Sequence, residues 1–562
     1  MHRRTLLTTT AAALAAPYLR PAPATAQAAS RAETLLLVQE YGPNSLDMQG
    51  IGASQPVNGV ALNCYDRLVR YKTVPLPGEG NGKTFTLNEL EPELAVSWQE
   101  ASDGTSVTFK LREAKFHSGR PVTAKDVKWS LDRAVSIGGF ATTQMNAGSM
   151  EKPEQFVALD DKTFRIDFIR RDKMLMPNLG VTIPFVFDSE TALRNAGGDP
   201  WAKEWLKNNV AGSGAFKVES WKPGTETIYV RNDGWWGERP KLRRVITRDI
   251  PSPSTRRALI ERGDADVSTL MPPKDFKDLA DGGRVKVVGV PVPNGIWYVA
   301  MNAATGPFTD PRVRQAVAWA IPYEKIMQAA LYGRGVPMWG AEGGPNVAWP
   351  QPFPYRTDVE KARALVQQAA PGGFSTSVLF DAGQSTVAEP IAVLVKEALA
   401  PLGITVELNK VPGANFRGEL NKKTSPMVIN RFAGWLDWPD YFFFWNYHGS
   451  NSVFNVASYQ NPAMDKLIDE ARFTADKSAY DAAVKGFVGM AEEQAPMVPL
   501  AQPLHDMAMQ KSIGGYQFWP SREPDPLLHQ GIGEGSGCCA WCCRGWGRRF
   551  PAWSGWWSSP SC

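Results

Sequence analysis

The chain has 562 residues, of which 43% are hydrophobic and 21% charged, with a formal net charge of +4. A polymer of this length exceeds the size at which a single core stops growing, so two or three lobes are expected. The small net charge gives no basic excess for nucleic acid, while 20 Trp residues favour the recognition of small molecules by stacking and contact area.

The N-terminus has the three parts of an export signal. Arg3-Arg4 supplies a twin-arginine charged start, residues 6–16 an apolar run, and Ala24-Thr25-Ala26 a small-residue cleavage site. We therefore expect a signal peptide over residues 1–26 and a mature chain in the periplasm, exported through the twin-arginine or the general secretory route. No cysteine directly follows the cleavage site, and no later apolar run reaches the ~20 residues of a membrane helix. The sequence therefore predicts neither a lipid anchor nor a membrane span.

The mature chain begins with strand patterns. Residues 34–39 form a strand-like apolar run. Asp103-Gly104 has the chemistry of a hairpin turn, and the residues behind it alternate in polarity, with Val107, Phe109 and Leu111 on one face. This pattern predicts a β-hairpin whose apolar face is buried.

Two helices have recognisable starts. Thr123 and Asp126 resemble a capping box ahead of the first helix. Asp310 can cap the second helix, and Pro311 suits its first position. The buried stripes expected on these helices are Val127, Leu131, Ala134 and Val135 on the first, and Val313, Val317 and Ala320 on the second.

Strand and helix patterns alternate again beyond residue 370, which is typical of an α/β fold. Strands are expected at 377–380 and 404–408. The helix between them is expected at 391–399, with Val393, Leu394 and Ala398 on its buried face. Two further helices are expected, one starting at Pro462 and one over 480–490.

Four parts of the chain resemble a known family. They are residues 93–135, residues 212–216 with 231–236, residues 258–266 with their Gly-x-x-Asp turn, and the segment FTDPRVRQAV at 308–317. The chain resembles the family 5 extracellular solute-binding proteins, the dipeptide, oligopeptide and nickel receptors of ABC importers, over about residues 30 to 530. The resemblance implies an α/β fold of the periplasmic binding protein type II-like class. Two lobes would be joined by a two-segment hinge, and the first lobe would carry an additional inserted subdomain.

Two proline-rich stretches suggest how the chain passes between these lobes. Residues 289–294 and 495–500 have the pattern of neighbouring extended crossings, and we expect the hinge there. The parts predicted in this way are a signal peptide (1–26), the first part of lobe I (27–72), the inserted subdomain (73–194), the second part of lobe I (195–290), lobe II (291–496), a return segment of lobe I (497–530) and a tail (531–562).

The tail differs from the rest of the chain. Residues 531–562 hold five of the six cysteines and show no apolar periodicity. We interpret the tail as translation continued in a wrong reading frame or as a disordered extension. Structural zinc sites pair cysteines from separated loops, and export would tend to oxidise these thiols, so no metal is expected there. The remaining cysteine, Cys64, is expected to be buried, and His117 to be a structural hydrogen-bonding residue.

The stretch from 429 to 455 is expected to form the ligand site. Two carboxylates, Asp437 and Asp440, lie there among many aromatic residues, with Arg431 upstream. A carboxylate among aromatic rings must be paired or hydrogen-bonded, or its burial is costly. A cleft wall for a cationic or zwitterionic ligand meets this requirement, because rings attract cations and an acid fixes an amine. The alternative is an aromatic strand that ends in a turn at 438–440, with its acids solvated.

The resemblance implies roles for individual residues in this stretch. The family's Gly-Trp-x-x-Asp segment holds the acid that binds the peptide amine, and it aligns with Gly434, Trp435 and Asp437 after one deletion. The deletion leaves Asp437 and Asp440 as alternatives, although an acid after a Trp-Pro pair is more naturally a solvated turn residue. Arg431 has two interpretations. It either meets a ligand carboxylate or is itself an ordinary surface charge. The expected ligand-binding residues are therefore Asp437, Trp435, Asp440, Arg431, Trp438 and Gly434.

The predicted function is that of a periplasmic receptor. It would capture a di- or oligopeptide between two closing lobes and deliver it to the permease subunits of an ABC importer at the inner membrane. We expect a monomer that is not an enzyme, with no cofactor, no bound metal and no nucleic-acid partner. One alternative changes the cargo to an opine, a nickel-chelate or an oligosaccharide. Another is a glycoside hydrolase using Asp437 and Asp440, but acids three residues apart beside a proline have no evident means of facing each other across a scissile bond.

Overall fold

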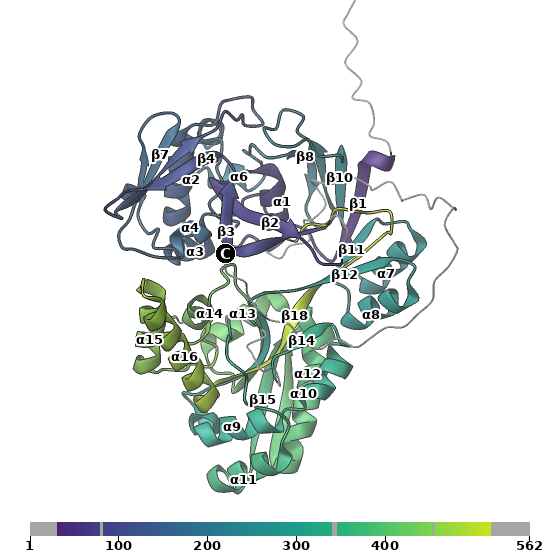
Figure 1. Cartoon of the computed structure of the whole chain (residues 1–562). Coiled ribbons are helices and arrows are strands. Elements are labelled where there is room, and N and C mark those ends of the chain that lie inside the picture. The colour runs from purple at the N-terminus through teal and green to yellow at the C-terminus, as the bar shows by residue number, and fades with distance from the viewer. Residues whose placement is uncertain (1–30, 79–81, 340–345, 452–453, 519–562) are drawn as a thin grey trace, which may run out of the picture.

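The computed structural model describes residues 31–78, 82–339, 346–451 and 454–518 (Figure 1). The chain forms two α/β lobes, drawn one above the other in Figure 1. The predicted signal peptide (1–26) and tail (531–562) lie outside the described residues. None of the described helices has the length and apolar character needed to cross a membrane.

One large sheet runs through both lobes. Among the described residues it has 12 strands, in the order β16-β15-β17-β13-β18-β11-β1-β10-β9-β8, and β12 and β14 also pair with β18. Its strands are β1 (Thr34–Gln39), β8 (Phe216–Lys222), β9 (Glu226–Arg231), β10 (Arg244–Asp249), β11 (Val267–Thr269), β12 (Lys286–Pro291), β13 (Gly295–Met301), β14 (Gly335–Pro337), β15 (Phe374–Asp381), β16 (Ile404–Val411), β17 (Met427–Ala433) and β18 (Met497–Met509). The strands predicted at 34–39, 377–380 and 404–408 are confirmed.

Strand β18 belongs to both lobes. Its first half pairs with β13 of the second lobe, and its second half pairs with β12 of the first lobe. Within the first half the register shifts between Trp297 and Tyr298, where Tyr298 lies opposite Pro499, which has no N–H to donate. The predicted crossing at 289–294 contains the end of β12, and the one at 495–500 contains the start of β18.

A smaller unit of the first lobe has a core of its own. Its sheet has the order β4-β5-β7-β6, and its buried side chains lie between Leu68 and Val186. We call it the β4–β7 unit; β2 (Val69–Pro75) and β3 (Lys83–Pro92) pair beside it. Its elements are β4 (Ala95–Glu100), β5 (Ser106–Leu111), β6 (Phe156–Ala158), β7 (Thr163–Asp167), α2 (Ala124–Ser136), α3 (Gly139–Asn146) and α4 (Leu175–Asn178).

Local predictions in this unit are confirmed. Strands β4 and β5 form the predicted antiparallel hairpin, and Val107, Phe109 and Leu111 are buried. Helix α2 starts with the predicted capping box, in which the Thr123 N–H donates to Asp126 Oδ2 over 3.1 Å. Both features depend on chemistry within a few residues, which is why the sequence predicts them.

The other helices belong to the two lobes. Those of the first lobe are α1 (Val57–Cys64), α5 (Ser189–Arg194), α6 (Lys203–Leu206), α7 (Pro253–Arg262) and α8 (Pro273–Gly282). Those of the second are α9 (Pro311–Ala320), α10 (Tyr323–Lys325), α11 (Val359–Ala369), α12 (Ser385–Leu399), α13 (Gly413–Lys422), α14 (Pro439–Asn446), α15 (Pro462–Phe473) and α16 (Lys477–Gln494). Asp310 caps α9 as predicted, because its Oδ1 accepts the Arg312 N–H at 2.8 Å.

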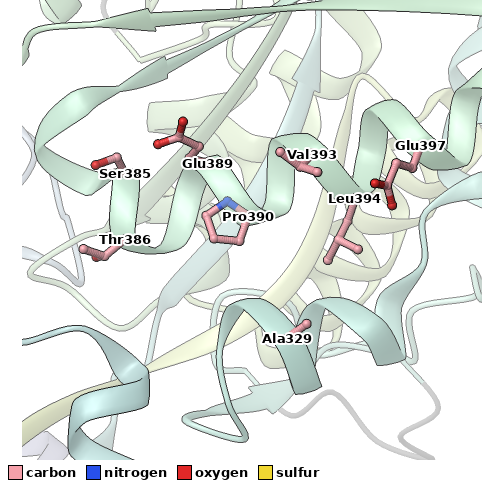
Figure 2. A pocket seen from close by; sticks show the side chains of 8 residues that line it. All are labelled: Ala329, Ser385, Thr386, Glu389, Pro390, Val393, Leu394 and Glu397. Atoms are coloured by element: carbon pink, nitrogen blue, oxygen red, sulfur yellow. The ribbon is translucent and has the colours of Figure 1, made fainter.

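The buried face of α12 differs from the prediction. Ile391, Val395 and Leu399 point into the core at i, i+4 and i+8, whereas Val393 is 37% exposed. Apolar residues occur all round this helix, so periodicity alone could not select the face. Val393 and Leu394 instead line an open groove of about 440 Å³ beside Ala329 (Figure 2), and none of the predicted ligand-binding residues lines it.

Two residues in the first lobe are structural, as predicted. Cys64 is fully buried, and a side chain at Gly212 would overlap its carbonyl, so only glycine allows this close approach. His117 Nε2 lies 3.0 Å from the carbonyl oxygen of Gly214, and burial lowers the pKa of His117 to about 4. The described residues hold no group of three or more His, Cys, Asp or Glu that could bind a metal ion.

Candidate functional site

The predicted site stretch is a strand, a short loop and a helix. Strand β17 ends at Ala433, and helix α14 begins at Pro439, whose fixed φ suits a first helical position. The aromatic residues from Tyr441 to Trp445 therefore lie on a helix, and the alternative of an aromatic strand ending in a turn is wrong. The loop between the two elements carries the residues predicted to bind ligand.

Gly434 and Trp435 begin this loop. A side chain at Gly434 would overlap the ring of Tyr441, so glycine allows Tyr441 to pack against the loop. Trp435 is half-buried, and its ring lies 4.8 Å edge-on from Phe140 of α3. This contact joins the second lobe to the β4–β7 unit.

Asp437 lies where the loop faces the first lobe. The residue is half-buried, and its Oδ1 atom is buried. Burial raises the pKa of Tyr71 of β2 well above its usual value, and the negative charge of Asp437 raises it further. The Tyr71 hydroxyl donates to the Pro177 carbonyl over 3.1 Å. Asp437 therefore places a carboxylate at the boundary between the lobes.

Asp440 has a different environment. It is 0% exposed, and its Oδ1 accepts from Lys173 Nζ at 3.1 Å and from the Tyr480 hydroxyl at 3.3 Å. Burial raises the pKa of Asp440 against the opposing charge of Lys173, and burial lowers the pKa of Lys173. The expectation of a solvated turn residue is wrong, because α14 places Asp440 against α16 and against a lysine of the first lobe.

Trp438 and Arg431 complete the predicted set. Trp438 is half-buried, and its ring centre lies 5.0 Å from Lys173 Nζ. Arg431 is exposed on β17, with its guanidinium carbon 5.8 Å from the centre of the Trp297 ring. The structure therefore brings Trp435, Asp437, Trp438 and Asp440 to the face between the lobes.

Several residues at this face were missed by sequence reasoning. The Tyr441 hydroxyl donates to Gln144 Oε1 over 2.9 Å, and Arg472 donates to Asp172 Oδ2 over 3.1 Å. Like the pair of Lys173 and Asp440, these bonds join positions about 300 residues apart. No local pattern around residue 172 predicts them, because each partner is brought in by tertiary packing.

The arrangement suits binding better than hydrolysis. A retaining or inverting glycosidase needs two carboxyl groups that flank the substrate, about 5 to 9.5 Å apart. Asp440 is buried against Lys173 and Tyr480, so its carboxylate does not face a substrate position. Asp437 and Trp435 together offer an acid and an aromatic surface at the boundary between the lobes, which is the chemistry that holds an ammonium group.

Comparison with known proteins identifies the family. The model of the "Bacterial extracellular solute-binding proteins, family 5 Middle" matches residues 89–454, which is more than half of the chain. The chain belongs to the family 5 extracellular solute-binding proteins. The resemblance predicted from the four sequence segments is confirmed.

Relatives of this solute-binding protein cover nearly its whole length. It is 28% identical to the probable D,D-dipeptide-binding periplasmic protein DdpA of Escherichia coli K12, over 83% of this chain and 87% of that protein. A dipeptide binding protein from Pseudoalteromonas sp. SM9913, solved in complex with Met-Leu, has a TM-score of 0.75 at 23% identity and covers 89% of this chain and 100% of its own. AgaA from A. tumefacien R10, solved with agropinic acid, has a TM-score of 0.73 at 24% identity, covering 90% and 99%. The predicted two-lobed periplasmic binding protein fold is confirmed.

Proposed function

We propose that this solute-binding protein captures a di- or oligopeptide between its lobes and delivers it to the permease subunits of an ABC importer. The family membership and the similarity to a probable D,D-dipeptide-binding protein of Escherichia coli support this cargo. The protein would act in the periplasm as a monomer, after removal of residues 1–26. It would need neither enzymatic activity nor a cofactor, since recognition and release are its whole task.

Asp437 carries the proposal. Its carboxylate lies at the boundary between the lobes, close enough to Tyr71 of the first lobe to raise the pKa of that hydroxyl. We assign Asp437 to the ligand's α-amine, with Trp435 as the adjoining aromatic surface and Gly434 allowing the loop its close packing. Asp440 and Trp438 hold the neighbouring Lys173 and so support this loop indirectly. Arg431, exposed on the preceding strand, is assigned to the ligand carboxylate.

Closing of the lobes would supply the affinity. The proposed hinge comprises the connection from β12 to β13 and the middle of β18, near the predicted crossings at 289–294 and 495–500. The proposed parts keep the predicted boundaries, with lobe II at 291–496 and the inserted subdomain at 73–194, which contains most of the β4–β7 unit. Closure removes water from the boundary, and each buried ion pair or hydrogen bond to ligand is then stronger than at the surface.

Native mass spectrometry of the freshly exported protein tests the cargo. We expect a copurified ligand whose fragment masses are those of amino-acid residues. A ligand with the fragments of an opine, a metal chelate or a sugar would keep the receptor but replace the peptide. Cleavage of oligosaccharides by the purified protein would contradict the receptor itself.

A further inference from the structure

The first lobe inserts a lysine into the second. Lys173, between β7 and α4, donates from Nζ to Asp440 Oδ1 at 3.1 Å and to the carbonyl of Ala471 at 2.6 Å. Its ammonium also lies 5.0 Å from the ring centre of Trp438 and 4.0 Å from that of Tyr480. These four residues, all of the second lobe, form what we call the ammonium box. An acid, a carbonyl and two aromatic rings are the groups that bind an ammonium ion, and here that ion belongs to the chain itself.

The second lobe returns an arginine to the first. Arg472 of α15 donates to the carbonyls of Asn146 and Ala147, each over 3.0 Å, and to Asp172 Oδ2 over 3.1 Å. The Asp172 side chain is 0% exposed and also accepts from Ser149. Asp172 and Lys173 are consecutive, so the two ion pairs lie side by side and point in opposite directions across the boundary.

In each pair, the cation that neutralises a buried carboxylate comes from the opposite lobe. Asp440 obtains its cation from the first lobe, and Asp172 is paired with an arginine from the second. A buried charge that loses its partner is strongly destabilising unless water can reach it. Separation of the lobes would admit that water. The two pairs therefore favour contact between the lobes. If a pair is broken, opening of the lobes can hydrate the carboxylate without unfolding the protein.

We propose that Lys173 and Arg472 form a reciprocal latch that holds the lobes closed and sets the fraction of closed protein in the absence of ligand. This proposal rests on the lobe closure of the proposed function. The latch makes affinity depend on residues that do not touch ligand, because the apparent dissociation constant rises as the closed fraction falls. It also explains why Asp440 lies beside Asp437 without sharing its role.

Small-angle X-ray scattering of the full exported chain, stripped of ligand, tests the latch. Lys173→Met keeps an apolar side chain of similar length but leaves Asp440 without its cation. We expect a larger radius of gyration and a ratio of open to closed protein that rises about tenfold or more, as for other truncated buried charge pairs. Lys128→Met is the matched control, because Lys128 pairs with Asp132 within helix α2 and should leave the curve unchanged. Superimposable curves for Lys173→Met and the parent protein would overturn the latch.

A second substitution tests whether the expansion comes from the unpaired charge of Asp440. In the double variant Lys173→Met with Asp440→Asn, the buried group is neutral and no longer needs to hydrate, so the radius should return toward that of the parent. A double variant that stays as expanded as Lys173→Met would overturn the latch, since the expansion would then not come from the unpaired charge of Asp440. No ligand enters this experiment, and its result therefore does not depend on whether the cargo is a peptide.

Discussion

The two lobes meet in two physically different ways. Strand β18 runs from the second lobe toward β12 of the first (Figure 1). It pairs with β12 of one lobe and β13 of the other through backbone hydrogen bonds. Beside the site, the contact depends on side chains, among them Lys173, Arg472 and Tyr441. A backbone ladder can bend but separates only on unfolding, whereas side-chain bonds can separate and exchange their partners for water. Stability and motion can therefore be changed at different residues.

The largest effect on unfolding is expected at the shared strand. Leu500 of β18 is fully buried, so Leu500→Ala leaves a cavity that no lobe movement can relieve. We expect a loss of about 2 to 5 kcal/mol in the free energy of unfolding, measured by urea denaturation. Leu500→Met keeps the volume and should cost less than about 1.5 kcal/mol. Equal losses for the two variants would argue against a tightly packed shared strand.

A buried acid inside the first lobe provides the next test. Asp66 is 1% exposed and accepts from the Ser213 hydroxyl and from Trp235 Nε1. Burial, with a contribution from the charge of Glu93, raises the pKa of Asp66 to about 6. Between about pH 4 and pH 6 the folded protein therefore holds a proton that the unfolded chain, with a pKa near 3.9, has lost. The stabilisation by this proton is fully present below about pH 4 and is lost as the pH rises through 6.

Asp66→Asn removes that titration. Between pH 4 and pH 7 the free energy of unfolding of the parent should fall by roughly 2 to 3 kcal/mol more than that of the variant, at 1.36 kcal/mol for each pKa unit. Urea denaturation of both proteins across this range gives the difference directly. Parallel pH profiles would mean that Asp66 does not carry a raised pKa. Unlike Asp440, Asp66 has its partners within one lobe, so opening of the lobes would not expose its carboxylate to water.

The smallest effect on unfolding is expected at the latch. Lys173→Met should change the free energy of unfolding by only about 1 kcal/mol or less, because opening of the lobes hydrates Asp440 before the fold is strained. Thermal and urea denaturation, run beside the scattering experiment, check this. A loss as large as that of Leu500→Ala would show that Lys173 belongs to the permanent core.

The features that the sequence predicts well are local. The capping box at Thr123 and the cap at Asp310 each depend on atoms within three residues of one another. The buried face of α12 was predicted wrongly, because both Val393 and Val395 lie on apolar stripes and only the sheet beneath decides between them. Local chemistry therefore determines where helices begin, and tertiary packing determines which face of a helix is buried.

The ligand site at residues 429–455 stays a prediction, and its internal arrangement was not predicted. The aromatic and acidic composition of residues 429–455 predicted a cleft wall for a cationic or zwitterionic ligand, and the structure places Trp435 and Asp440 of this stretch against the first lobe. The environment of Asp440 could not be predicted, because Lys173 is 267 positions away and occurs in an ordinary basic run. The cation beside Asp440 proved to be part of the chain.

The central claim is that a ligand amine binds Asp437, while Asp440 holds the protein's own lysine. Calorimetry tests it with a peptide taken from the copurified ligands and with its N-acetylated form. Asp437→Asn should lose about 2 to 5 kcal/mol of affinity for the free peptide, thirtyfold or more, and almost none for the acetylated one. Glu407→Gln, which removes an exposed charge from β16, is the matched control and should bind both peptides like the parent.

Asp440→Asn completes the comparison in the same titrations. It acts through the latch, so any loss of affinity should be the same for the free and the acetylated peptide. The account predicts that acetylation cancels the effect of Asp437→Asn and leaves the effect of Asp440→Asn unchanged. The reverse pattern, with the acetylation effect lost only in Asp440→Asn, would contradict it.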